Sequence, residues 1–398
     1  MIPARSRPAW AEISANALRH NAEVVKKQIG SAALCAVVKA DGYGHGASLV
    51  AKVFEQAGIA NFAVANIDEG IELRQAGISG SILCLSEPDI CAIPEALNEG
   101  ITLTLYSREA MLRTRQAAEK VFKESIDSEK RIGYHLKIDT GMHRVGANPS
   151  EIMDLAVYGN EIGLKMEGFW THLSVADQPN VSDLVEFTMR QLSIFDDLKE
   201  KLLQSGYAPR FHVANSAAAY NYPGSHFHMV RSGIALYGCS PSLDTEIEDL
   251  WPVMTLKARV SFIREVGPGE FPSYGRKRPT TGDRTVLATV PLGYADGIPR
   301  RLFESGVEVL ISGERRPLAG TITMDQVIVD CGDDPDVSVG DEVVFIGTQG
   351  SQSVTADEWA DLLGTINYEV ITGIGFRVPR ILDSSGMPNY GSGALGLT

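Results

Sequence analysis

The feature that most constrains the fold is an alternation of short apolar runs with longer amphipathic stretches between about residues 12 and 240. Continuous apolar runs are typical of parallel strands covered on both faces. The candidate strands are residues 33–38, 61–65, 81–86, 101–105, 134–139, 165–170, 210–213 and 228–231. A helical pattern over 14–29 begins at a candidate N-cap, Ser14, and ends at Gly30. Similar patterns separate nearly all the runs, so we predict an α/β chain with a (β/α)8 TIM-like barrel.

A doubly wound open sheet is the alternative fold for such an alternation. That fold would place a glycine-rich G-x-G-x-x-G turn after its first strand. This chain has KADGYGHG at residues 39–46 instead, which favours the barrel.

The pattern changes after about residue 248 to β-branched runs cut by Gly, Pro and Asp at short spacing. This is typical of an antiparallel β domain, interrupted by one helix candidate, TADEWADLLG. We therefore expect a barrel over 11–247 and a C-terminal mostly-β domain over 248–382, which residues 1–10 could join. The Gly/Ser-rich stretch 383–398 is expected to be a loose tail.

Charge and composition exclude several classes of function. The 36 Lys+Arg against 50 Asp+Glu give a net charge of −14, without a basic stripe, which argues against nucleic acid and against an anionic membrane surface. No apolar run approaches the roughly 18 residues of a membrane-spanning helix, and no apolar stretch follows the basic N-terminus as in a secretory signal. The five cysteines are scattered, which indicates reduced, buried thiols. We expect a cytoplasmic enzyme that binds a small molecule.

Polar residues follow the ends of several predicted strands, where barrels place their active sites. They are Lys39, Lys137, Asp139, Arg144, His172, Asn215, Ser216, Arg231 and Gly233. Taken singly, a lysine at a strand end is often simply exposed to solvent, and a histidine is often a buried residue whose hydrogen bonds are made within the core. Several ionisable groups at one rim are harder to explain in that way, because unpaired buried charge is expensive.

Lys137 stands out because it lies inside a predicted strand, between Leu136 and Ile138. A buried ammonium must find a partner, lose its proton or be modified. Pairing with Asp139 or another carboxylate is a reasonable alternative to a functional role.

The loops after the last two strands, residues 214–220 and 231–238, are rich in small residues whose backbone N–H groups can surround an anion. Barrels commonly bind phosphate at these loops. A phosphate site together with a rim lysine suggests pyridoxal phosphate bound through that lysine. A plain sugar-phosphate enzyme stays open on the residues alone.

An ordered series of motifs resembles the bacterial alanine racemases, which are pyridoxal phosphate enzymes. The motifs are VVKADGYGHG (37–46), HLKIDTGMHRVG (135–146), THLSVAD (171–177), HVANSAA (212–218), MVRSGIALYG (229–238), PSYGR (272–276), LGYADG (292–297), ITMDQ (322–326) and NYEV (367–370). They cover almost the whole chain apart from the tail. The resemblance implies an isomerase that interconverts L- and D-alanine and supplies D-alanine for peptidoglycan, working as a homodimer with shared sites.

By the same resemblance, Lys39 holds the cofactor and is the base on one face of the substrate, and Tyr274 of the second subunit is the base on the other. The residues implied in cofactor binding are Lys39, Tyr43, His172, Asn215, Ser216, Arg231, Gly233, Ile234 and Tyr368. Those implied in substrate binding are Arg144 and Met324. Arg231 would face the pyridine nitrogen, which stays unprotonated because a guanidinium does not release a proton. Lys137 matches a lysine that is carbamylated in many members.

Three positions depart from the family pattern. Phe376 stands where members often carry an aromatic hydroxyl that touches the phosphate, unless Tyr368 substitutes. Thr321 stands where many have an arginine, and His143 lies at a variable position.

Other functions stay open: a racemase of broader specificity that accepts serine, a non-catalytic pyridoxal phosphate-binding protein, and a decarboxylase. A metal site is not expected, because His226 and His228 have no obvious third ligand.

Overall fold

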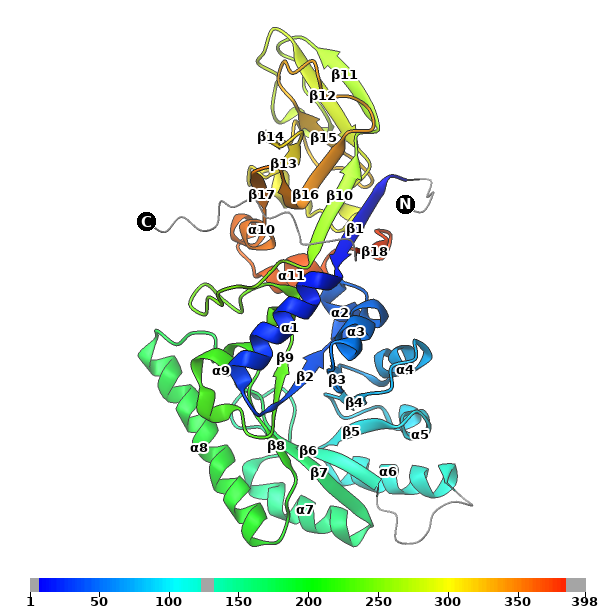
Figure 1. The fold of residues 1–398 in the computed structure, drawn as a ribbon, viewed down its shortest axis with the longest axis vertical. Helices are drawn as coiled ribbons and strands as arrows, with labels where there is room; N and C mark the ends of the chain where they lie inside the picture. The colour runs from blue at the N-terminus through cyan, green and yellow to red at the C-terminus, as the bar shows by residue number, and fades with distance from the viewer. Residues whose placement is uncertain (1–6, 123–131, 384–398) are drawn as a thin grey trace.

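The computed structural model describes residues 7–122 and 132–383. One part is an eight-stranded parallel sheet with its helices, and the other is built mainly from antiparallel strands (Figure 1). The expected fold class, a TIM-like barrel followed by a C-terminal β-rich domain, is confirmed. The expected tail lies almost wholly outside the described residues.

The barrel sheet has the strand order β8-β7-β6-β5-β4-β3-β2-β9. Its strands are β2 (Ala33–Val37), β3 (Asn61–Val64), β4 (Ser81–Cys84), β5 (Ile101–Leu105), β6 (Ile132–Lys137), β7 (Leu164–Trp170), β8 (Arg210–His212) and β9 (Met229–Ser232). Each overlaps one of the predicted apolar runs, with ends that differ by up to two residues. The backbone N–H of His228 donates to the Phe211 carbonyl over 3.1 Å and that of Arg231 to the Ala214 carbonyl over 3.0 Å. These bonds join the two ends of the strand order, at β8 and β9, and close the barrel.

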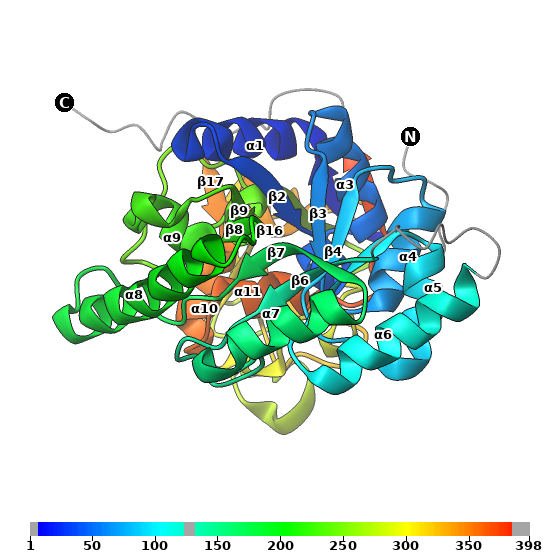
Figure 2. The ribbon, with the colours of Figure 1, turned by 90° about the horizontal axis from the view of Figure 1, so that it is seen from below.

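Helices surround this barrel, as the view from below shows (Figure 2). They are α1 (Ala15–Ile29), α3 (Ala47–Gln56), α4 (Ile67–Gln75), α5 (Ile93–Asn98), α6 (Arg108–Val121), α7 (Ile152–Glu161), α8 (Ser182–Gln204) and α9 (Ser216–Asn221). The Ser14 hydroxyl accepts a hydrogen bond from the Ala17 N–H over 3.2 Å, so the predicted N-cap of α1 is confirmed.

The second part contains two sheets. One has the order β14-β13-β16-β10-β1-β18, with β17 beside β16, and the other has the order β11-β12-β15. Their strands are β1 (Ala9–Ser14), β10 (Met254–Arg259), β11 (Phe262–Val266), β12 (Thr285–Val290), β13 (Glu308–Ile311), β14 (Glu314–Pro317), β15 (Val327–Asp330), β16 (Glu342–Gln349), β17 (Gln352–Val354) and β18 (Arg380–Asp383). The predicted helix is α10 (Ala356–Leu363), and α11 (Asn367–Thr372) follows it.

The first strand of the chain, β1, belongs to the sheet of the second part. It pairs antiparallel with β10 and parallel with β18, so it spans the domain boundary expected at residue 11. Nearby, both terminal nitrogens of Arg7 donate to the buried Asp296 carboxylate over 2.9 and 2.6 Å. The N-terminal segment is thereby fixed to the C-terminal part.

Two further observations concern the sequence-based expectations. All five cysteines are free, but Cys91 is exposed, which corrects the expectation that every thiol is buried. Within the described ranges, no helix has the length and apolar character needed to span a bilayer.

Candidate active site

Lys39 begins the segment labelled α2 (Lys39–Gly44), directly after β2 at the carboxyl rim of the barrel. This segment is a left-handed turn, because residues 40–43 all have φ between 52° and 61°. This conformation is unfavourable by about 1–2 kcal/mol for each non-glycine residue. The turn contains three such residues, Ala40, Asp41 and Tyr43. Strain of this size at a rim lysine is typical of a functional site.

Contacts from distant elements hold the turn. The Glu69 carboxylate on α4 accepts from the Ala40 N–H over 2.8 Å and from the Ala65 N–H over 2.7 Å. Arg380 Nε of β18 donates to the Gly44 carbonyl over 2.8 Å. A Cβ on Gly44 would lie 2.3 Å from the Ile371 carbonyl oxygen of α11, so only glycine fits there.

A group of small and hydroxyl-bearing residues lies beside the turn. The Gly233 N–H donates to Ser216 Oγ over 3.0 Å, and Ser216 Oγ lies 3.1 Å from Ser232 Oγ. A Cβ on Gly233 would be 2.4 Å from the Tyr43 hydroxyl oxygen, so the absence of a side chain brings the phenol against this backbone. Ile234 follows, buried, and Asn215 accepts from the Ala218 N–H over 2.9 Å to cap α9.

Two aromatic positions near the C-terminus are clearly separated. The Tyr368 ring centroid lies 6.1 Å from that of Tyr43, whereas Phe376 is 96% exposed. Tyr368 therefore lies beside Tyr43, whose own hydroxyl is the one against the Gly233 backbone. Burial raises the pKa values of both tyrosines, that of Tyr43 to about 12, so both hydroxyls stay protonated and can donate hydrogen bonds.

Arg231 is buried on β9 and its hydrogen bonds go to neutral acceptors. Nη1 donates to His212 Nδ1 over 2.9 Å, and Nη2 donates to the carbonyls of Thr171 and Val213 over 2.9 and 3.0 Å. Nη2 also lies 3.5 Å from His172 Nδ1. Among the described carboxylates none forms an ion pair with this guanidinium, so its charge is left for a ligand.

Lys137 is 4% exposed, and its Nζ lies 4.4 Å from the ring centroid of Trp170. Burial, together with the charges of Arg231 and Arg144, lowers the pKa of Lys137 to about 7. Asp139 is engaged elsewhere, because it accepts from the N–H groups of Gly141 and His143. In the part of the chain that the structure covers, no carboxylate pairs with Lys137, so the structure gives no support to the ion-pair alternative.

The charges of this region act on one another. Burial and then the charge of Arg144 lower the pKa of Lys39, while Glu69 opposes the shift. Burial also lowers the pKa of His172 well below its usual value, with Arg231, Lys137 and Arg144 adding to the effect. Positively charged side chains outnumber negatively charged ones in this region, which favours the binding of an anion.

Tyr274 and Met324 do not belong to this buried group. They lie on the second part of the chain and are 71% and 53% exposed. The Thr321 hydroxyl donates to the Tyr274 carbonyl over 2.9 Å, so this departure from the family pattern fixes the backbone that carries the phenol. The Met324 carbonyl accepts from the Ala295 N–H over 3.0 Å.

Sequence reasoning missed several residues that complete the site, namely Glu69, Trp170, His212 and His135. His212 Nε2 lies 2.9 Å from His135 Nδ1, and Trp170 stacks on His212 with ring centroids 5.6 Å apart. Strand alternation offered a signal, because His135 is two residues before Lys137 and shares its side of β6.

The arrangement fits pyridoxal phosphate. It offers a rim lysine, a cradle at Gly233 that a Cβ would fill, and a guanidinium that no described carboxylate neutralises. Tyr43, Ser216 and the backbone at Gly233 and Ile234 would hold the phosphate, and Arg231 would face the ring nitrogen. The fold and site thus define a pyridoxal phosphate enzyme built on a barrel.

Comparison with known proteins gives the particular family. Residues 13–241 match the family described as "Alanine racemase, N-terminal domain", and residues 253–382 match "Alanine racemase, C-terminal domain". The chain belongs to the alanine racemase family, as the sequence motifs predicted. It is a pyridoxal phosphate-dependent isomerase that acts on alanine.

Relatives of similar length agree. The chain is 42% identical to the alanine racemase of Carboxydothermus hydrogenoformans, over 94% of this chain and 99% of that one. It is similar to the alanine racemase structure from Clostridium difficile 630, with a TM-score of 0.87, 38% identity and coverage of 95% and 96%. The Bacillus anthracis alanine racemase with bound L-Ala-P gives a TM-score of 0.84 at 35% identity, covering 96% of both chains.

Proposed function

We propose that the chain racemises alanine with two acid–base groups, Lys39 on one face of the substrate and Tyr274 on the other. The observation that carries this proposal is the division of the site into a half-buried lysine at the barrel rim and an exposed phenol on the second part. Racemisation removes the proton on Cα from one face and adds one to the opposite face, so two opposed groups suffice. The test is chiral analysis of alanine incubated with the wild type and with variants at both residues.

The chain's own residues would divide the work as follows. Pyridoxal phosphate, when bound, supplies the electron sink that makes the Cα proton of alanine acidic. Lys39 Nζ and Tyr274 Oη would hold or take the proton at Cα. Arg144 and the backbone N–H of Met324 would bind the substrate carboxylate, and Arg231 would keep the ring nitrogen unprotonated because a guanidinium does not give up its proton.

We further propose a homodimer in which each Tyr274 and Met324 complete the partner's site. Their exposure supports this, because a catalytic phenol that faces water in one chain needs a second surface to exclude water around it. Symmetry would then give two identical shared sites per dimer.

Mixing two inactive variants tests this arrangement. We expect Lys39→Ala and Tyr274→Phe chains, unfolded and refolded together, to recover about one quarter of wild-type activity, because half the dimers are hybrids with one complete site of two. A matched control mixes Lys39→Ala with the Lys39→Ala/Tyr274→Phe double variant, in which no complete site can form. Hybrids seen by native mass spectrometry without any activity would contradict the shared site.

Lys137 is proposed to carry a carbamate. A lowered pKa leaves much of the amine neutral at pH 7, and neutral Nζ can attack the carbon of CO2 and release a proton. The product is an anion beside Arg231 and Arg144, which resolves the unpaired buried cation.

We expect native mass spectrometry to show the added mass of one CO2 per chain, and protein equilibrated with 13C-bicarbonate to give one carbamate NMR signal. Both should be absent in Lys137→Met and should disappear in acid, where carbamates decompose. A wild-type chain without either signal would leave Lys137 as a free amine.

Selectivity and location are the remaining proposals. We propose alanine as the preferred substrate over serine and larger amino acids, which kcat/KM values measured side by side would decide. A racemase of broader specificity on the same fold is the alternative.

A cytoplasmic location is also proposed, supported by the scattered free cysteines.

A further inference from the structure

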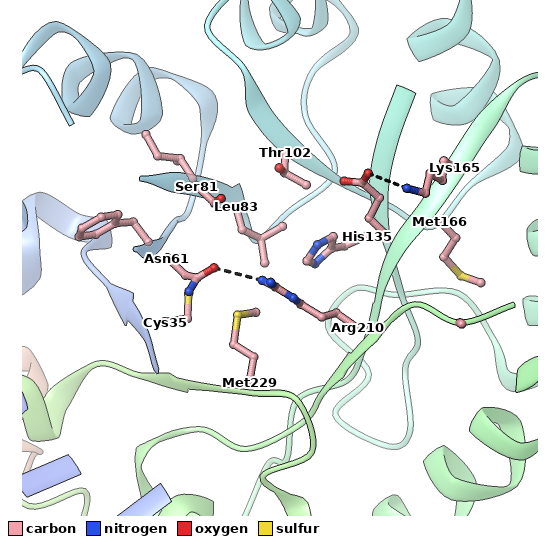
Figure 3. Close-up of a pocket in the computed structure, with 14 residues that line it drawn as sticks. Cys35, Asn61, Ser81, Leu83, Thr102, His135, Lys165, Met166, Arg210 and Met229 are labelled. Atoms are coloured by element: carbon pink, nitrogen blue, oxygen red, sulfur yellow. Dashed lines mark hydrogen bonds and ion pairs between the residues drawn. The ribbon is translucent and has the colours of Figure 1, made fainter. Parts of the chain in front are cut away.

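A line of buried hydrogen bonds runs through the barrel interior from Arg231 to the opposite mouth. Arg231 Nη1 lies 2.9 Å from His212 Nδ1, and His212 Nε2 lies 2.9 Å from His135 Nδ1. His212 is fully buried and His135 is 8% exposed. The line ends at a cavity of about 330 Å3 that His135 borders (Figure 3).

This cavity lies at the amino-terminal ends of the strands, away from Lys39. Its lining includes Asn61, Ser81 and Arg210, the first residues of β3, β4 and β8. Arg210 Nη1 donates to Asn61 Oδ1 over 3.2 Å, as Figure 3 shows. His135 therefore connects the active-site side of the barrel with its other end.

The direction of every hydrogen bond in the line follows from the guanidinium. Arginine is a donor only, so His212 Nδ1 must accept and carry no proton. A neutral His212 then has its proton on Nε2, and that N–H donates to His135 Nδ1. His135 in turn carries its proton on Nε2. Burial, with the positive charges of Arg210 and Arg231, lowers the pKa values of both histidines, that of His135 to about 3, in agreement with neutral rings.

The backbone fixes the ring of His135 in this line. The register of the β6–β7 pairing shifts between Tyr134 and His135, and His135 lies opposite Gly168. A Cβ on Gly168 would lie 2.4 Å from His135 Cγ and Nδ1, so β7 leaves room for this ring only because residue 168 is glycine.

We propose that His135 is a positioning residue for Arg231: by accepting from His212 Nε2–H, it holds the His212 ring in the orientation in which Nδ1 accepts from the guanidinium. This role rests on the proposed assignment of Arg231 to the cofactor ring. Without an acceptor at position 135, the buried His212 N–H loses its partner, and the other tautomer would turn an N–H toward an N–H of Arg231.

The experiment compares holoenzymes of the wild type, His135→Leu and His135→Asn. Imidazole 15N NMR separates protonated from unprotonated ring nitrogens, and the chain has only 8 histidines to assign by single substitution. In the wild type we expect Nδ1 of His212 and of His135 to be unprotonated and both Nε2 atoms protonated. His135→Leu should leave the proton of His212 on Nε2, shift the NMR signal of that N–H because it has lost its acceptor, and lower kcat roughly tenfold, as expected for a weakened hydrogen bond to a charged group, with a smaller change in KM.

His135→Asn places an amide oxygen near the Nδ1 position and should restore both the His212 signals and most of kcat. Gly168→Ala, which leaves the histidine but displaces its ring, should reproduce the effect of His135→Leu. His228→Leu is the matched control, because His228 Nδ1 accepts from the Phe211 N–H outside the line.

An unchanged His212 Nε2–H signal in His135→Leu would overturn the hydrogen bond from His212 to His135. A shifted Nε2–H signal with unchanged kcat would overturn the link from His212 to the reaction. Arg231→Lys tests separately the assignment of Arg231 to the cofactor ring, because the effect of this variant on cofactor absorbance and kcat does not depend on His135.

Discussion

Replacing Tyr274 by phenylalanine is expected to lower the rate of alanine racemisation by roughly 10²–10⁴-fold, the usual contribution of one acid–base group. The substitution removes only the hydroxyl and leaves the Thr321 hydrogen bond to the residue 274 backbone in place. Because Lys39 and the Gly233 cradle are untouched, the cofactor absorbance should be retained. Racemisation followed by circular dichroism or chiral chromatography measures the loss.

Solvent exchange distinguishes a lost base from a disturbed site. In D2O the Tyr274→Phe protein should still exchange the Cα proton of one enantiomer, since Lys39 serves that face, and exchange the other enantiomer slowly. Tyr158→Phe is a suitable control, because it loses a hydroxyl while keeping the ring that lies 4.5 Å from the Arg108 guanidinium carbon. Wild-type racemisation by Tyr274→Phe would refute the opposite-face assignment.

Replacing Lys39 by alanine is expected to have the larger effect, because it removes both the covalent anchor and a base. We expect racemisation to fall by more than about 10⁴-fold and the bound cofactor to be lost on dialysis. The lysine also lowers the pKa of Lys137, so the pKa of Lys137 should rise in this variant.

Chemical rescue separates this role from folding. A small primary amine such as methylamine should restore part of the activity of Lys39→Ala, since it replaces the missing nitrogen without altering the fold. Lys52→Ala, on the exposed side of α3, removes a lysine with no expected effect. A Lys39→Ala protein that kept its cofactor through dialysis and its full rate would rule out the assignment.

Much of the barrel could be predicted from the sequence because its strands are covered on both faces and read as continuous apolar runs. The strand β1 gives no such signal. It borders the helix N-cap at Ser14, and its partners in β10 and β18 lie far along the chain. Local patterns carry little information about such distant pairing.

The site shows the same division between local and distant causes. Lys39, Lys137 and Arg231 follow from their places at strand ends or inside strands. The left-handed turn does not, because Ala40 and Tyr43 have no local preference for positive φ. The partners of Arg231 also depend on which side chains meet inside a closed barrel.

The contacts that hold the lysine turn have a consequence for biosynthesis. Ile371 and Arg380 follow the whole barrel in the sequence, with Arg380 336 residues after Gly44, so they leave the ribosome after the barrel has been synthesised. A nascent barrel lacks these contacts, so we expect residues 40–43 to adopt a backbone conformation of lower energy until the contacts form. We therefore expect the cofactor to attach only after residues 371–380 have been synthesised and packed against the turn.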